Sequence, residues 1–212
     1  MPKAEKKKIK DKWRDKTWFS ISAPPYFGGN IVALAPCNDS VEILNRAVET
    51  TLYDVTGDFS QQHIKLYFKT ADVKGSKVDT VFKGHEYSRD YLRSLVRRGS
   101  TRIEGIYKVT LGDGHQMRVS AIAFTASRIK QAQGHSIRRI MRETLETKAS
   151  TLGFDNFVQE AVLGKIASEI FNEAKKIAPL RHVGIQKSKL IFSPTVGDQG
   201  AKKEETEEKE KP

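Results

Sequence analysis

The hairpin pattern at residues 103–125 constrains the fold more than any other feature of this sequence. Two strand-like runs, IEGIYKVTL and QMRVSAIAFTA, flank a short segment whose sequence is GDGH, and its two glycines suit a tight turn. In the second run, apolar residues occupy alternate positions from Met117 to Ala123, and its last part is apolar on both faces. A strand of that kind is covered from both sides. The pattern therefore predicts an antiparallel pair with other elements packed against it.

The remaining periodicities predict further strands and several helices. Alternating residues indicate strands near 48–52 and 64–69, paired antiparallel, and a last strand at 182–192. Helices are predicted at 88–99, at 137–150 after a loop around Gly134, and from Asp155 to about Ile177 before Pro179. This order of strands, helix, hairpin and helices favours an α+β fold over a doubly wound sheet.

The two ends of the chain differ in composition from its middle. Residues 1–12 are rich in lysine and 196–212 are of low complexity, so neither segment buries enough apolar area to order itself. We therefore expect a basic N-terminal extension (1–22), a single domain (23–195) and a disordered acidic tail (196–212). Within the extension, Trp18 is expected to pack in the core, whereas Trp13 could either pack or stack on bases.

The charge balance indicates an anionic partner. Lys and Arg number 37 against 26 Asp and Glu, which gives a net charge of +11 and a pI near 9.6. Nucleic acid is the first candidate partner and a membrane surface the second. The sequence has no apolar run near 18 residues and no signal-peptide core, which argues against the membrane. A single cysteine, Cys37, is expected to be structural or inert and favours an intracellular protein.

Several basic clusters predict an extended RNA footprint. The densest, Arg128–Arg142, has five positive charges and no acidic residue, and a second cluster spaces arginines four residues apart on a predicted helix. Arginine suits phosphate oxygens and stacking on bases, and no DNA-binding motif is visible. The residues expected to bind RNA are Lys7, Lys8, Lys10, Lys12, Trp13, Arg14, Arg89, Arg93, Arg97, Arg98, Arg128, Lys130, Gln131, Gln133, His135, Arg138, Arg139, Arg142, Lys187 and Lys189.

No constellation of catalytic or metal-binding residues is visible in the sequence. The five histidines are scattered, without the spacing of a metal site, and there is no glycine-rich phosphate loop. We therefore predict no catalytic residue, no metal, no cofactor and no small-molecule substrate. An RNA-processing enzyme stays open as an alternative, and so does a free RNA-binding regulator or RNA chaperone.

Four blocks of sequence, occurring in order, carry a resemblance to a known family. The blocks are WRDKTWFSISAP, FKGHEYSRDYLRSLVRRGSTRIEG, TLGDGHQMRVSAIAFTASRIKQAQGHSIRRIMRE and IAPLRHVGIQKSKLIFSP. Together they closely resemble the archaeal and eukaryotic small-subunit ribosomal protein family "S three A e" ("e S one"), over roughly residues 8–195. The short N-terminal arm and acidic tail look more like archaeal members.

The resemblance implies a curled, barrel-like antiparallel sheet with helices packed around it and basic extensions. It implies a cytoplasmic, structural protein of the small (30S) ribosomal subunit, with a role in translation and subunit assembly. Such a protein would bind the 3′ region of small-subunit rRNA on the platform near the mRNA exit, beside other platform proteins. Carried over by position, the block from Arg118 through Arg142 would be the main rRNA contact, and the WRDKTW arm would follow RNA or a neighbouring protein.

Overall fold

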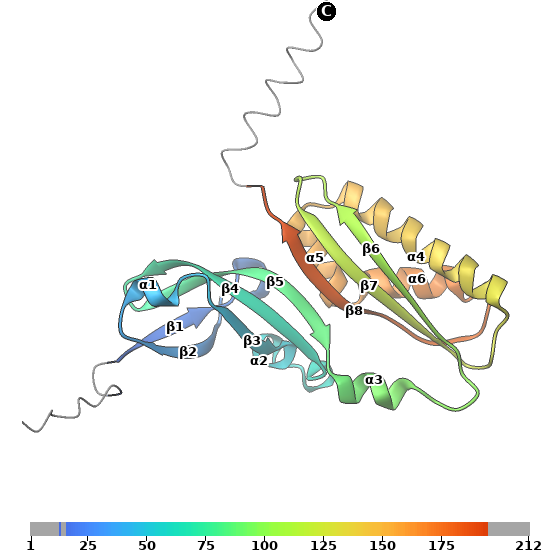
Figure 1. The fold of residues 1–212 in the computed structure, drawn as a ribbon, viewed down its shortest axis with the longest axis horizontal. Coiled ribbons are helices and arrows are strands. Elements are labelled where there is room, and N and C mark those ends of the chain that lie inside the picture. Colours follow the sequence, from blue (N-terminus) through green and yellow to red (C-terminus); the bar gives the residue numbers. More distant parts are fainter. Residues whose placement is uncertain (1–12, 14–15, 195–212) are drawn as a thin grey trace, which may run out of the picture.

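The computed structural model describes Trp13 and residues 16–194, which form a mixed α+β structure (Figure 1). Its strands are β1 Thr17–Ser22, β2 Ile31–Cys37, β3 Ala47–Thr51, β4 Ile64–Lys74, β5 Lys77–Tyr87, β6 Arg102–Thr110, β7 Gln116–Thr125 and β8 Leu180–Phe192. Its helices are α1 Ser40–Ile43, α2 Leu52–Thr56, α3 Arg89–Leu95, α4 Gln131–Thr151, α5 Phe154–Val162 and α6 Lys165–Ala174, with short 3₁₀ turns η1 Pro25–Phe27 and η2 Phe59–Gln61. The expected α+β class is confirmed.

All eight strands of the described residues belong to one open sheet. The main path runs β2-β1-β5-β8-β7-β6, and β3 joins it through β4, which pairs with β5. Every pairing is antiparallel except the short parallel contact of β1 with β5. The barrel-like closure that we expected is not found, because β2 and β6 end the path without pairing with each other.

Strand β5 joins the two halves of the molecule (Figure 1). Strands β1–β5 form the N-terminal half, and β6–β8 with α4–α6 form the C-terminal half. The connection is short: residues 84–86 of β5 pair with residues 187–189 of β8. A Cβ atom added to Gly84 would lie 2.3 Å from the carbonyl oxygen of Ser188. Glycine is therefore required where the two halves meet.

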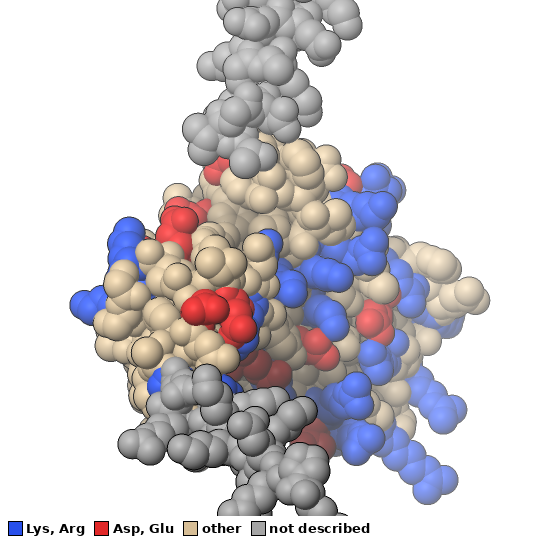
Figure 2. Space-filling view, turned by 60° about the vertical axis from the view of Figure 1, so that its left-hand side comes forward, with Lys and Arg blue, Asp and Glu red and all other residues tan. Residues whose placement is uncertain are grey.

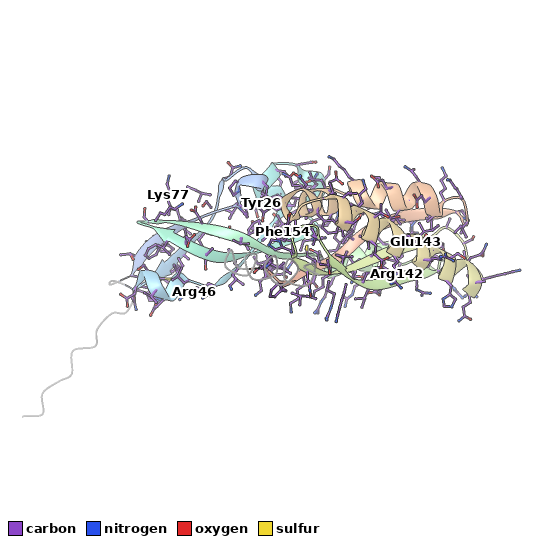
Figure 3. The ribbon with its side chains drawn as sticks, turned by 90° about the horizontal axis from the view of Figure 1, so that it is seen from above. Tyr26, Arg46, Lys77, Arg142, Glu143 and Phe154 are labelled. Atoms are coloured by element: carbon purple, nitrogen blue, oxygen red, sulfur yellow. The ribbon has the colours of Figure 1, made fainter. Side chains whose placement is uncertain are left out.

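Helices α4, α5 and α6 cover one face of the C-terminal strands (Figure 3). The main core lies between these two layers and continues into the N-terminal half, where it includes Phe68 of β4 and Phe82 of β5. Met117 and Val119 of β7 are buried there with Ile137, Met141 and Leu145 of α4, as the alternation in the sequence predicts. A smaller core lies under β1 and β2, and it contains Phe19, Ile21, Cys37, Ile43 and Val78. Cys37 is buried, which agrees with a structural role.

Two helices differ from their predicted bounds in the C-terminal half. Helix α4 begins at Gln131, so Gly134 is a buried residue inside the helix rather than part of a loop. One glycine costs a helix about 1 kcal/mol relative to alanine, which is too little to stop a helix of 21 residues with a buried face. The predicted helix after Asp155 is two helices, because Gly164 adopts a positive φ of 85° between α5 and α6.

Two predictions for the N-terminal half also need correction. Trp18 is 59% exposed rather than buried, because it alternates in β1 with Phe19 and points to the opposite side. Helix α3 ends at Leu95, earlier than predicted, and none of its residues is buried. The arginine ridge on this helix therefore contains only Arg89 and Arg93, while Arg97 and Arg98 lie in the turn that follows.

Candidate nucleic-acid interface

The face of the C-terminal strands that turns away from the helices carries a row of basic side chains. Arg118 of β7 lies between Met117 and Val119, which are both buried beneath the helices, so its own side chain points the other way. Lys108 of β6 and Lys189 of β8 are the residues directly opposite Arg118 on its two neighbours. Opposite residues share a face of the sheet. Further along β7 the same face is buried, at Ile122 and Phe124. We call its exposed part around Arg118 the open face.

The three side chains form a line across three adjacent strands. Neighbouring strands lie about 4.8 Å apart, so Lys108, Arg118 and Lys189 follow one another in steps of about that length. All three are exposed, and no carboxylate of the described residues forms a salt bridge with any of them. Lys187 stands beside them, with its Nζ atom 2.7 Å from Glu86 Oε2. We call these four residues the cationic row.

The cationic row is unfavourable for the isolated protein. Like charges directly opposite each other on a sheet are destabilising, by a few tenths of a kcal/mol to about 1 kcal/mol per pair. The described residues supply a carboxylate only to Lys187. A polyanion on the open face would remove the repulsion among the other three. The space-filling view shows that Lys and Arg gather on one side of the molecule (Figure 2).

Two shallow hollows extend the cationic row toward helix α3. The first, of about 210 Å³, lies between Tyr67 of β4 and the residues Lys187 and Lys189 of β8. The second, of about 470 Å³, shares Tyr67 and Glu86 with the first and reaches Arg89 and Arg93. The structure thus places two predicted arginines of α3 next to the predicted lysines of β8. The half-buried ring of Tyr67 lies between them.

A third hollow, of about 490 Å³, shares Tyr87 with the second hollow. Three side chains that can carry a positive charge line it, and no carboxylate does. They are His63, Arg181 and His182. Partial burial is the main cause that lowers the pKa of His182, and the nearby His63 and Arg181 lower it further. Buried nitrogen atoms of both Arg181 and His182 have no hydrogen-bond partner. An anion in this hollow would lie near Arg181 and His182 without meeting a carboxylate of the lining.

The predicted cluster on α4 lies in the helix layer, where Figure 3 labels Arg142. Arg139 and Arg142 are exposed and pair with Glu143 and Glu146 one turn later, at 2.8 and 2.7 Å. Exposed pairs of this spacing contribute only about 0.3–0.5 kcal/mol, so a phosphate can replace the glutamate at little cost. Four further predicted residues are exposed in or near this helix: Arg128, Lys130, Gln131 and His135.

Two other predicted residues of this cluster are engaged inside the protein. The Nε atom of Arg138 donates to the carbonyl oxygen of Glu104 at 3.0 Å, on the free edge of β6. Tyr107 donates from its hydroxyl to the carbonyl oxygen of Arg138 at 2.8 Å. Gln133 accepts from the backbone of Lys130 at 3.1 Å and so caps α4. These contacts give Arg138 and Gln133 structural roles.

The N-terminal part of the predicted footprint is described at one residue only. Trp13 is 64% exposed, and the Nζ atom of Lys16 lies 4.2 Å from the centre of its ring. The other predicted residues of the arm lie outside the described residues: Lys7, Lys8, Lys10, Lys12 and Arg14.

No group of residues in the described part of the chain is arranged for metal binding. His85 is buried and shares a hydrogen bond of 2.6 Å with Ser188, and its burial lowers its pKa to about 4. His115 stacks on Phe154 and His63 on Tyr91.

Within the described residues, no helix is long and apolar enough to cross a membrane.

Sequence reasoning missed Lys108, Arg181 and His182. Lys108 could have been found by counting from the turn, because the register of the predicted hairpin places it opposite Arg118. Arg181 and His182 could not have been found from the sequence, because residues more than 100 positions earlier in the chain, such as His63, form the other side of their hollow.

Comparisons with known proteins identify the family of this chain. Residues 4–194 match the Ribosomal S3Ae family. The chain is 48% identical over 191 residues to small ribosomal subunit protein eS1 of Sulfurisphaera tokodaii, which covers 90% of this chain and 99% of that protein. It is 44% identical over 195 residues to the protein of the same name from Staphylothermus marinus, with 92% of each chain covered. The chain therefore belongs to the Ribosomal S3Ae family.

Proposed function

We propose that this protein is a structural component of the small ribosomal subunit and binds its rRNA through the open face of the sheet. The observation that supports this most is the cationic row, in which Lys108, Arg118 and Lys189 stand side by side without carboxylate partners among the described residues. The small subunit is proposed as the particle because the relatives are named small ribosomal subunit protein eS1. The family is one of structural ribosomal proteins and not of enzymes.

The rRNA would follow the open face from β6 to α3. Its phosphates would contact Lys108, Arg118 and Lys189 first, and then pass Tyr67 toward Arg89 and Arg93. Each phosphate neutralised by a cation releases condensed counterions, and this release supplies much of the binding free energy. The half-buried ring of Tyr67 offers a surface on which a base can stack.

The helix layer supplies a second contact surface in this proposal. Arg128, Lys130, Arg139 and Arg142 are exposed there and would meet another rRNA segment or another strand of the same segment. The position within the particle is the platform, at the 3′ region of the rRNA near the mRNA exit, beside other platform proteins. The protein is accordingly a cytoplasmic protein of the ribosome that takes part in subunit assembly and translation.

Photo-crosslinking in assembled particles tests this function. A photoreactive residue at position 189 is expected to crosslink to one region near the 3′ end of the small-subunit rRNA. The protein should also sediment with small subunits and remain bound at moderate salt. The matched control carries the same photoreactive residue at position 77, which Figure 3 shows at the far end of the N-terminal half.

Each other outcome has a definite meaning. A protein found only in the free soluble pool would contradict a ribosomal role. Crosslinks dispersed over many RNAs would favour a free RNA-binding regulator or RNA chaperone. Equal rRNA crosslinking from positions 77 and 189 would contradict the proposal that rRNA binds preferentially to the open face.

A further inference from the structure

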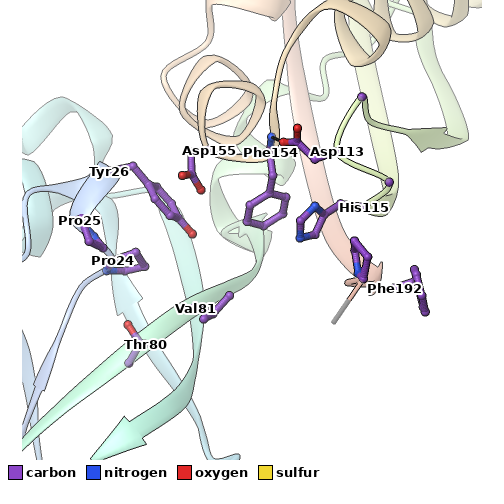
Figure 4. A pocket seen from close by; sticks show the side chains of 13 residues that line it. Pro24, Pro25, Tyr26, Thr80, Val81, Asp113, His115, Phe154, Asp155 and Phe192 are labelled. Atoms are coloured by element: carbon purple, nitrogen blue, oxygen red, sulfur yellow. Dashed lines mark hydrogen bonds between the residues drawn. The ribbon is translucent and has the colours of Figure 1, made fainter. Parts of the chain in front are cut away.

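A large cavity lies away from the cationic row and has a different chemistry. It has a volume of about 850 Å³ and lies between the two halves of the molecule (Figure 4). One side is formed by η1 and strand β5, with Tyr26 and Val81. The other side is formed by the β6–β7 turn, the start of α5 and the end of β8, with His115, Phe154 and Phe192.

The walls of this cavity are largely aromatic. The rings of His115 and Phe154 stack with their centres 4.5 Å apart, and Tyr26 meets Phe154 edge to face at 6.4 Å. Phe192 at the end of β8 is 44% exposed, and three prolines line the cavity as well: Pro24, Pro25 and Pro194. Large exposed apolar surfaces in soluble proteins mark binding sites.

The charge of the cavity is opposite to that of the whole protein. Asp113 and Asp155 line it, while no lysine or arginine does, although the chain has a net charge of +11. Asp113 accepts a hydrogen bond of 2.7 Å from the backbone of Phe154 and is held in place. Asp155 forms no hydrogen bond or salt bridge with any described residue, and it lies between Tyr26 and Phe154 in Figure 4.

The environment of Asp155 makes its negative charge unfavourable in the free protein. Partial burial raises the pKa of this carboxyl, and the neighbouring charge of Asp113 raises it further, while His115 has a smaller, opposite effect. A cation placed between the two carboxylates would reverse this effect. The Nδ1 atom of His115 is also buried without a hydrogen-bond partner in the same wall.

We propose that this cavity docks an arginine-bearing segment of a neighbouring protein. A guanidinium group can pair with a carboxylate and stack on an aromatic ring at the same time, and the cavity offers both. A lysine fits less well, because its ammonium group is more strongly hydrated and cannot stack as a plane. RNA is disfavoured, because its phosphates would approach two carboxylates with no basic residue in the lining.

Binding of a model peptide to the purified full-length protein tests the proposal. The probe is a fluorescein-labelled peptide of four Arg-Pro repeats, and its affinity is measured by fluorescence polarisation. Asp155→Asn is expected to weaken binding about three- to tenfold, in the range seen for a single partly exposed charge contact. The control Asp72→Asn removes the same charge from the exposed surface of β4 and should leave the affinity unchanged.

A second variant tests occupancy of the cavity directly. Val81 is 42% exposed at the cavity, so Val81→Arg can fold and would place a guanidinium group of the protein itself there. It should abolish peptide binding, and a peptide of four Lys-Pro repeats should bind the wild type more weakly than the Arg-Pro peptide. Equal affinities of the wild type, Asp155→Asn and Val81→Arg would overturn the proposal.

The RNA-binding proposal is tested separately in the same samples. Asp155→Asn and Asp72→Asn should bind an rRNA fragment from the 3′ region with equal affinity. If Asp155→Asn instead strengthens RNA binding well beyond the control, RNA occupies the cavity and the protein partner is wrong. A loss of rRNA binding when Arg118 and Lys189 are replaced with alanine, without any change in peptide affinity, would show that the two surfaces act independently.

Discussion

Arg138 shows how the local contacts of one residue decide its role. Its position in a dense basic stretch predicts an RNA contact, but its Nε atom donates to the backbone of Glu104 at the edge of the sheet. Arg139, the next residue, pairs only with an exposed glutamate. Both residues carry the same charge in the same stretch of sequence. Sequence patterning therefore identifies the basic segment but cannot tell which arginines are available to a ligand.

This difference predicts unequal effects on stability. Arg138→Ala should lower the free energy of unfolding by about 1–2 kcal/mol, because a partly buried backbone carbonyl loses a charged donor. Arg139→Ala, which breaks only an exposed ion pair, should change it by less than about 0.5 kcal/mol. Urea unfolding of the two variants measures both values. Equal and small effects would mean that the contact of Arg138 with Glu104 does not stabilise the fold.

His182 predicts a dependence of RNA affinity on pH. In the free protein its pKa is lowered, first by burial and then by His63 and Arg181. The pKa of His63 is lowered as well, mainly by burial, and two tyrosines, Tyr87 and Tyr91, complete the surroundings. A phosphate in this hollow would favour the protonated rings and raise both pKa values.

Affinity for RNA should consequently rise as the pH falls from 8 toward 6, since proton uptake accompanies binding. His182→Gln should reduce this rise, and Arg181→Gln should weaken binding at every pH. Titration of an rRNA fragment at several pH values measures the effect. An unchanged pH profile in His182→Gln would exclude a phosphate from this hollow.

Among the elements, the hairpin and the buried stripe of helix α4 were the most predictable, although the start of α4 was placed six residues too late. The turn glycines and the two-residue alternation locate β6 and β7 nearly to the residue, and the buried stripe of α4 follows the predicted period. The break between α5 and α6 was not visible, because the apolar positions Val158, Val162, Ile166 and Ile170 keep a four-residue spacing through it. The backbone conformation of one glycine interrupts the helix without interrupting that pattern.

Replacement of Gly164 tests the cause of this break. Its φ of 85° is in the left-handed region, where a Cβ atom costs about 1 kcal/mol or more. Gly164→Ala should therefore destabilise the protein by about that amount, and Gly164→Asn by less, because asparagine tolerates this conformation better. Thermal unfolding ranks the two variants. A more stable Gly164→Ala variant would mean that the two helices can join into one.

At the scale of the whole molecule, the sheet order could not be predicted from the sequence. The contact between β5 and β8 joins residues about 100 positions apart, and neither strand carries a local signal for its neighbour. The proposed rRNA surface depends on this contact as well, because the contact brings Lys187 and Lys189 beside Tyr67 and toward α3. The predicted basic clusters could therefore be located in the sequence but could not be assigned to a common surface.

Gly84 is the position at which this joint can be tested. A Cβ atom there would lie 2.3 Å from the backbone of β8, so Gly84→Ala should cost about 1–3 kcal/mol through overpacking. Gly112→Ala is the control, since its nearest contact would be an ordinary 3.7 Å, and it should change stability by less than about 0.5 kcal/mol. Chemical unfolding compares them. Similar values for the two variants would show that β5 and β8 can separate at no cost.

The salt dependence of rRNA binding tests the central claim, that rRNA lies on the open face, most directly. The slope of log K against log salt concentration counts the phosphates neutralised, at about 0.7–0.9 per contact. Replacing Arg118 and Lys189 together with alanine should reduce the slope by about 1.4–1.8. The control replaces Lys74 and Lys77 at the far end of the β4–β5 hairpin and should leave the slope unchanged. Equal slopes for both double variants would contradict the claim.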